Sequence, residues 1–253
     1  MAKPTTQQLL EAGVHFGHLR KKWNPKMAPF IFTEKNGIHL IDLNRTSESL
    51  ERAANAVRQI ARAGKKILFV ATKKQARDIV SAAAQEVNMP YVTDRWQGGM
   101  LTNFNTIRRS IRKMQNIERM LGDGTLDSVT KKERLTLTRT HEKMNKVLGG
   151  IADMQRIPNA IFVVDIVHEH LAIAEAKKLG MRTIGIVDTN ADPNSVDYAI
   201  PGNDDASKSI KVLVDYLVEA IKEGLAERNE EKDAKESAGE QPAATAPAAP
   251  AAE

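Results

Sequence analysis

The chain has 253 residues, with 37 Lys and Arg against 32 Asp and Glu, and it contains no cysteine. The lack of cysteine excludes disulfides, thiolate metal sites and thiol nucleophiles. The N-terminus does not resemble a signal peptide, and no apolar run reaches the roughly 20 residues of a membrane span, so we expect a soluble, cytosolic protein. The charge is uneven, because residues 1–150 carry a net +14 whereas residues 151–224 and 225–253 carry −5 and −4, which predicts that the N-terminal part meets a polyanion.

The N-terminal segment is expected to form a short helix over residues 5–13, followed by a basic loop. Basic side chains supply phosphate contacts, and a tryptophan can stack on a base or a ribose. The candidate RNA-binding residues of this loop are Arg20, Lys21, Lys22, Trp23, Asn24 and Lys26. Trp23 could equally be buried beneath the loop. His15 and His18 have a spacing that allows metal chelation, but without nearby acidic or thiol ligands we expect packed or hydrogen-bonded histidines.

A β-hairpin and a helix are predicted next. Asn36-Gly37 separates two apolar runs, and Asn-Gly is a strong signal for a two-residue hairpin turn because both of its residues take positive φ. The helix is expected to begin after Thr46 or Ser47. Its apolar stripe stops at Gly64, which predicts the helix end there.

The following strand and helix could hold an RNA phosphate. Residues 67–70 form an unbroken apolar run of the kind that a parallel sheet buries on both faces. Lys73 and Lys74 then open a helix, and a helix N-terminus with two lysines can bind a phosphate. The glycines that a nucleotide-binding P-loop requires before its lysine are absent, so we exclude that site.

A polar connection over residues 91–113 concentrates cationic, aromatic and amide side chains. Gly98 and Gly99 remove side chains where a partner could approach closely, and Asp94 is the one acid of the stretch. This combination suits a phosphate-rich partner, and the alternative is an ordinary connection with a solvated basic face. The candidate RNA-binding residues here are Arg95, Trp96, Asn103, Asn105, Arg108, Arg109 and Arg112.

Residues 105–150 predict an inserted helical hairpin. Apolar residues recur at alternating steps of three and four in both halves, and Gly122-Asp123-Gly124 separates the halves. The segment carries eleven bases against five acids. We therefore expect a projecting antiparallel coiled-coil arm that meets RNA or a partner protein, and the alternative is a helical subdomain packed on the sheet.

The alternation of strands and helices resumes after residue 150 and predicts an α/β fold with a mostly parallel sheet flanked by helices. Residues 1–104 and 151–224 are expected to form this globular domain. The later elements are strands over 160–165, 183–188 and 198–201 and helices over 168–179 and 206–224. Residues 225–253, which end in an Ala- and Pro-rich run, are expected to be a disordered tail.

Three aspartates raise an enzymatic alternative. Asp165 and Asp188 end two predicted strands, and Asp192 follows in the next loop. Ligands of open α/β sheets bind at this edge, where clustered carboxylates could hold magnesium for phosphoryl chemistry. Asp and Asn are also common turn formers and caps, and no nucleophile with an adjacent base is evident. We therefore favour a protein without catalytic activity, cofactor or metal.

Motifs spread over residues 5–224 resemble the family of bacterial ribosomal small-subunit protein two. They are AGVHFGH at 12–18, WNPKM at 23–27, NGIHLIDL at 36–43, ILFVATKKQA at 67–76, RWQGGMLTNF at 95–104, LGGI at 148–151 and DTNADPNSVDYAIPGNDDA at 188–206. The resemblance implies a flavodoxin-like sheet with an inserted coiled-coil hairpin. It further implies a structural role in the small subunit of the cytoplasmic ribosome, binding to small-subunit rRNA between head and body, and docking of small-subunit protein one nearby, with no membrane or small-molecule substrate.

Overall fold

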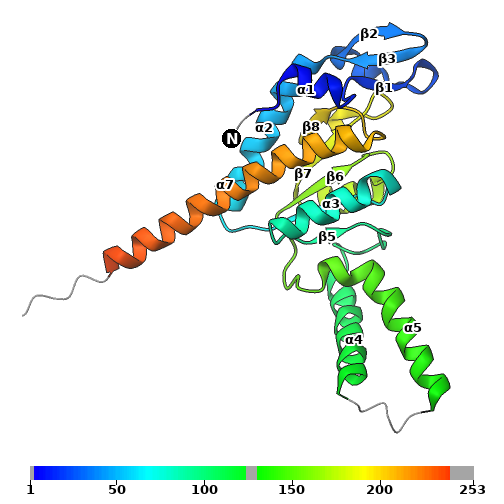
Figure 1. Ribbon diagram of the computed structural model, residues 1–253, viewed down its shortest axis with the longest axis vertical. Coiled ribbons are helices and arrows are strands. Elements are labelled where there is room, and N and C mark those ends of the chain that lie inside the picture. The colour runs from blue at the N-terminus through cyan, green and yellow to red at the C-terminus, as the bar shows by residue number, and fades with distance from the viewer. Residues whose placement is uncertain (1–2, 124–129, 240–253) are drawn as a thin grey trace, which may run out of the picture.

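The computed structural model describes residues 3–123 and 130–239 of the chain. A parallel sheet lies at its centre, a smaller antiparallel sheet covers one end, and two helices project from the other end (Figure 1). One long helix runs across the sheet and continues beyond it.

The central sheet has five parallel strands in the order β5-β4-β6-β7-β8. This is the 2-1-3-4-5 order of flavodoxin-like folds when the strands are numbered along the chain. The predicted parallel sheet is therefore confirmed. The strands are β4 (Ile67–Val70), β5 (Tyr91–Val92), β6 (Ala160–Val164), β7 (Arg182–Val187) and β8 (Tyr198–Pro201).

Helices cover both faces of this sheet because alternate strand residues point to opposite sides. Phe69 and Phe162 pack on one side with α2 (Leu43–Arg62), α3 (Lys74–Glu86) and α7 (Ser207–Gly239). Leu68 and Val163 pack on the other side with α6 (His170–Lys178) and with the polar connection before α4. The sheet is buried between two apolar layers.

The first long helix begins earlier than its sequence pattern suggested. α2 starts at Leu43, where Asp42 caps it by accepting a hydrogen bond from the Asn44 backbone N–H at 2.9 Å. Thr46, one of the expected caps, is instead buried inside the helix and donates to the Pro201 carbonyl at 2.8 Å. A tertiary partner on β8 thus gives Thr46 a role that its neighbours in sequence do not indicate.

The N-terminal residues form a second, three-stranded sheet. α1 (Thr6–Glu11) precedes β1 (Phe16–Leu19), and β2 (Ile31–Lys35) pairs with β3 (Ile38–Ile41) as the predicted hairpin. Asn36 and Gly37 have φ of 54° and 76°, which confirms the expected turn. The pairing of β1 with β3 was not expected. Two 3₁₀ helices, Arg20–Lys22 and Pro25–Phe30, lie between β1 and β2.

Two helices replace the α/β alternation where an inserted hairpin was predicted. α4 (Phe104–Gly122) and α5 (Lys131–Leu148) project from the sheet and contact each other (Figure 1). Ile111, Met114 and Ile117 of α4 are buried, whereas the predicted apolar positions of α5 are half-buried until Leu148. The coiled-coil packing of this pair stays a prediction.

The expectation of a disordered tail from residue 225 is wrong for residues 225–239, because α7 continues to Gly239. The extension lies along α2, where Glu227 pairs with Arg58 at 3.2 Å and Glu231 pairs with Arg62. Gly224 permits the close approach, since a Cβ there would lie 2.4 Å from the Arg58 carbonyl oxygen. Acids spaced four residues apart on α7 thus pair with basic residues of α2. The composition of the tail alone does not reveal this helix pairing. Residues 240–253 lie outside the described part of the chain.

Candidate nucleic-acid interface

The loop before α4 is organised around one carboxylate, Glu175 of α6. Its Oε1 accepts hydrogen bonds from the Trp96 indole N–H at 3.1 Å and from the Gly99 backbone N–H at 2.8 Å. Its Oε2 accepts from the backbone N–H groups of Leu101 and Thr102, both at 3.0 Å, and from the Thr102 hydroxyl at 3.1 Å. Burial disfavours the ionised form, but these donors outweigh it and lower the pKa of Glu175.

This arrangement places Trp96 inside the protein. The side chain is only 8% exposed, it packs in the apolar layer under α4, and its N–H is used by Glu175. An indole in this position anchors the loop and offers little surface to a nucleobase. The aromatic signal in the sequence therefore marks a structural residue.

The cationic side chains of the same stretch remain at the surface. Arg95, Arg109 and Arg112 are exposed, and Arg108 is half-buried. Asp94 does not cancel them, because it pairs with Arg77 at 3.2 Å and lies 3.7 Å from the Lys146 ammonium. A loop and helix start whose single acid is already neutralised present a net positive surface.

The amides of this stretch lie beside these cations. Asn105 is exposed on the first turn of α4. Asn103 is exposed as well and precedes the helix, with its side-chain oxygen accepting from the Thr106 hydroxyl at 2.9 Å. Asn103 therefore keeps its amide N–H groups for a partner.

The basic loop over residues 20–26 is held against the parallel sheet by the β7–β8 connection. The Asn24 backbone N–H donates to the Thr189 carbonyl at 2.8 Å, and the Asn24 side chain accepts from the Lys26 N–H. Lys26 pairs with Asp192 at 2.6 Å, which lowers the pKa of that carboxyl. Trp23 is 37% exposed and its ring centroid lies 5.2 Å from that of His39.

All four bases of this loop, Arg20, Lys21, Lys22 and Lys26, are exposed. Arg20 pairs with Glu34 at 3.2 Å. Lys21 and Lys22 have no carboxylate within ion-pair distance among the described residues. These two lysines are therefore available to an anionic partner.

Lys73, a candidate phosphate ligand, points into an acidic cluster at the C-terminal edge of the sheet. Its ammonium lies 3.1 Å from Asp165, 2.9 Å from Asp204 and 2.6 Å from Asp205. Burial would lower the pKa of Lys73, but the hydrogen bonds and charges of these aspartates outweigh it and raise the pKa. Lys73 thus neutralises the protein's own carboxylates, whereas Lys74 is exposed.

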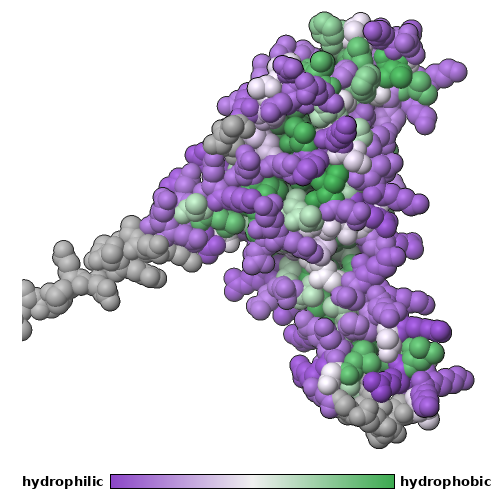
Figure 2. Space-filling view, viewed as in Figure 1, coloured by the Kyte–Doolittle hydropathy of each residue, from purple (hydrophilic) through white to green (hydrophobic). Residues whose placement is uncertain are grey.

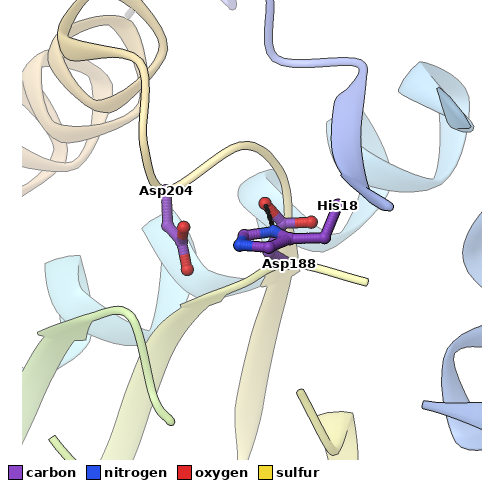
Figure 3. A group of neighbouring side chains, drawn as sticks. All are labelled: His18, Asp188 and Asp204. Carbon is purple, nitrogen blue, oxygen red and sulfur yellow. Dashed lines mark ion pairs between the residues drawn. The ribbon is translucent and has the colours of Figure 1, made fainter. Parts of the chain in front are cut away.

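His18 joins the same cluster from β1. Its Nδ1 lies 2.9 Å from Asp188, its Nε2 lies 3.5 Å from Asp205, and the hydrogen bond with Asp188 raises its pKa. Ligand atoms of His18, Asp188 and Asp204 lie within 4.8 Å of one another and could hold a divalent cation (Figure 3). Asp192, the third member of the predicted magnesium trio, is instead paired with Lys26.

Comparison with known proteins decides the family. Residues 9–224 match the family model described as Ribosomal protein S2. The chain belongs to the ribosomal protein S2 family. The predicted resemblance is confirmed, and family membership makes the chain a structural protein of the ribosome in the cytoplasm, working in translation, and not an enzyme.

Curated relatives of the ribosomal protein S2 family match almost the whole chain. The small ribosomal subunit protein uS2 of Cytophaga hutchinsonii is 60% identical over 227 residues, or 90% of this chain and 89% of that protein. Flavobacterium johnsoniae uS2 is 55% identical over 251 residues, 99% and 98% of the two chains. Bacteroides thetaiotaomicron uS2 is 54% identical over 243 residues, 96% and 87%.

Apart from Lys73 and Lys74, the candidate RNA-binding residues fall into two separate groups. The loop over residues 20–26 lies with the small sheet at the top of Figure 1, and residues 95–112 lie at the base of α4 and α5 below. Lys74 lies apart from both groups, at the start of α3.

No helix between residues 3–123 or 130–239 has the length and apolar character needed to cross a bilayer.

Sequence reasoning missed the residues that organise the loop before α4 and the acidic cluster around Lys73. Glu175 lies in an ordinary helix more than 70 residues from its partners, and no local pattern marks it. Asp204 and Asp205 follow β8 just as Asp165 and Asp188 follow β6 and β7. That shared position after parallel strands is the signal that could have added them to the cluster.

Proposed function

We propose that the chain binds small-subunit rRNA through cations and amides on two surfaces and at the start of α3, as a structural constituent of the small ribosomal subunit. The observation that carries the proposal is the unneutralised positive surface from Arg95 to Arg112, held in place by Glu175. Lys73 and Trp96 have structural roles, so we do not include them among the proposed RNA contacts. The proposed contacts are Arg20, Lys21, Lys22, Trp23, Asn24, Lys26, Lys74, Arg95, Asn103, Asn105, Arg108, Arg109 and Arg112.

These contacts fit the way in which proteins bind folded RNA. RNA helices offer phosphates and 2′-hydroxyls across a shallow minor groove, while unpaired bases can stack on rings or bond to amides. Arginine contributes a rigid fork of donors that matches phosphate geometry. The projecting α4 and α5, as a coiled-coil arm with eleven bases against five acids over residues 105–150, would extend the same surface.

Replacing Arg108 and Arg109 together with alanine is expected to lower the salt dependence of rRNA binding. Two lost phosphate contacts reduce the slope of log affinity against log salt by roughly two units. The measurement is filter binding to small-subunit rRNA between 50 and 200 mM KCl, with circular dichroism to check folding.

The matched control is Lys177→Ala with Lys178→Ala, which removes two adjacent bases from the last turn of α6. It should leave the slope unchanged. Equal slopes for the two double variants and the wild type would show that Arg108 and Arg109 face solvent in the complex.

A separate apolar surface supports docking of another small-subunit protein. The family resemblance implies that this partner is protein one. Phe32 of β2 is 76% exposed, and Leu10, Phe16 and Leu19 of α1 and β1 are also exposed. Apolar residues gather over this small sheet at the top of the space-filling view (Figure 2). Exposed aromatic side chains beside a basic loop are typical of protein contact surfaces.

Phe32→Asp is expected to weaken capture of small-subunit protein one from a nuclease-treated mixture of purified subunit proteins by at least tenfold. A desolvated aromatic contact is worth about 2 kcal/mol, and a buried carboxylate adds a further cost. Thr33→Asp, a neighbouring exposed position on β2, serves as the control. Undiminished capture by the Phe32 variant would move the docking site elsewhere.

A further inference from the structure

A cavity at the opposite edge of the sheet from the acidic cluster has no role in the contacts described so far. Its volume is about 790 Å³, within the range of roughly 300–1,000 Å³ common for small-ligand pockets. It lies where β4, β5 and β6 begin, bounded by the end of α3 and by the segment that follows α5. Ligands of open α/β sheets usually occupy the other edge, which Lys73 and its aspartates fill here.

The rim of this cavity is cationic. Lys65, Lys66 and Arg156 line it and are exposed, against one acid, Asp153. The guanidinium of Arg228 on α7 lies close to Gly64, which lines the same cavity, since a Cβ on Gly64 would be 2.8 Å from the Arg228 Cζ. Three rim cations against one acid favour an anionic ligand.

The lining of this cavity offers an aromatic ring and amide groups that can recognise a nucleobase. Tyr91 lines the cavity as a half-buried ring whose hydroxyl accepts a hydrogen bond from Gln85 at 2.8 Å. Uncharged amide side chains line the same cavity, and an amide has both a donor and an acceptor that can pair with a base edge. These amide side chains are Gln85, Asn88, Gln155 and Asn159.

A second, smaller hollow lies next to this cavity. It has a volume of about 260 Å³ and is lined by Arg108 and Arg112 of α4. The two hollows share Asp153, Met154 and Gln155 as a common wall. Cations of α4 therefore lie on one side of this segment, and Lys65, Lys66 and Arg156 lie on the other.

We propose that the base of the α4–α5 projection binds one single-stranded RNA segment, with an unpaired base in the larger cavity beside Tyr91 and flanking phosphates on the cations of both hollows. The inference rests on the proposed rRNA-binding function and adds a site for an unstacked nucleotide. A duplex does not fit it, because a paired and stacked base cannot enter a cavity of this kind. Aromatic and cationic groups along one path are the usual means of holding single strands.

The test measures binding of fluorescein-labelled octauridylate to the full chain by anisotropy between 50 and 200 mM KCl. Lys65→Gln with Arg156→Gln removes two proposed phosphate contacts, so the salt slope should fall by roughly 1.4 units, at about 0.7 for each contact on a single strand. Ile157→Glu, which adds a negative charge at an exposed lining position, should weaken binding in the same salt-dependent manner. Lys177→Gln with Lys178→Gln should leave the slope unchanged.

Crosslinking identifies the base site directly. Octauridylate carrying 5-iodouridine, irradiated with the full chain, should give a crosslink to Tyr91 when the peptides are mapped by mass spectrometry. An eight-base-pair duplex with the same label should not crosslink there. Crosslinks confined to other residues, together with unchanged slopes in both cavity variants, would overturn this inference.

A parallel titration with whole small-subunit rRNA separates the two proposals. Strong rRNA binding with no effect at the cavity would refute the single-strand site and keep the proposed function. Absence of rRNA binding by the wild-type chain would refute both.

Discussion

Replacing Lys73 with methionine is expected to lower the free energy of unfolding at pH 7.5 by about 3–5 kcal/mol, the usual cost of removing one partner from a buried ion pair. The Lys73 ammonium is the single lysine or arginine cation among the described residues within ion-pair distance of Asp165, Asp204 and Asp205. Asp204 and Asp165 are both buried. Methionine keeps much of the side-chain volume but leaves Asp165 and Asp204 without a lysine or arginine partner, and only His18 remains near Asp205, at 3.5 Å.

Urea unfolding followed by circular dichroism provides the measurement. Lys74→Met is the matched control, because Lys74 is the next residue, is exposed and has no partner carboxylate within the described residues. Its effect should stay within about 0.5 kcal/mol, as for most surface substitutions. Similar values for the two lysine variants would mean that the cluster is solvated and contributes little to stability.

The Lys73 variant should also show a steeper pH dependence. Burial raises the pKa of Asp204 to about 7, with the charges of Asp165 and Asp188 adding to the effect. A carboxyl whose pKa rises on folding holds its proton more tightly in the folded state. Stability therefore falls as the pH rises from about 4 to about 7. Without Lys73 to oppose this shift, the deficit of the variant should be larger at pH 7.5 than at pH 5, and Asp204→Asn in the variant should restore part of it.

The elements that sequence reasoning predicted are those whose signals are local. The Asn36-Gly37 turn needs only its own two residues and the flanking apolar runs, and Gly64 ends α2 with a φ of 70°. The apolar run over residues 67–70 predicts a strand buried on both faces for the same reason. Each of these features is decided within a few residues of chain.

The features that could not be predicted depend on partners distant in sequence. Lys73 has the appearance of a phosphate ligand until its aspartates, 92 and 131 residues away, are brought beside it. Trp96 resembles a stacking residue until Glu175 reaches its N–H from 79 residues away. Basic and aromatic residues can serve RNA or the protein's own interior, and only tertiary contacts decide between the two.

Glu175→Gln is expected to disorder the loop from Trp96 to Thr102 and to destabilise the protein by about 2–4 kcal/mol. The carboxylate accepts five hydrogen bonds, and all five partners are donors. Glutamine must direct its own NH₂ group at either two or three of them, which loses those charge-assisted bonds, each worth about 1.5–3 kcal/mol. In either orientation one buried residue, Trp96 or Leu101, is left with an unpaired donor. Partial relaxation of the loop keeps the total below the sum.

The loss should be visible at individual amides. Hydrogen exchange of the Gly99, Leu101 and Thr102 N–H groups should accelerate in the variant while the strands of the sheet keep their protection. Because the pKa of Glu175 is lowered on folding, its contribution is present above its ordinary value near 4.5 and is lost as the pH falls through the folded pKa. The difference between wild type and variant should therefore shrink in acid.

The same substitution links the loop to the proposed interface. Arg95 precedes the Glu175-bound segment and Arg108 follows it on α4, so a disordered loop no longer fixes the distance between these cations. Affinity for small-subunit rRNA should fall by at least tenfold without any change in the number of positive charges. Glu219→Gln, at an exposed position on α7, changes the net charge identically and should leave affinity and exchange unaltered. If Glu175→Gln also left rRNA binding intact while the loop amides exchanged freely, the cations would act through their charge alone and not through the geometry that Glu175 imposes.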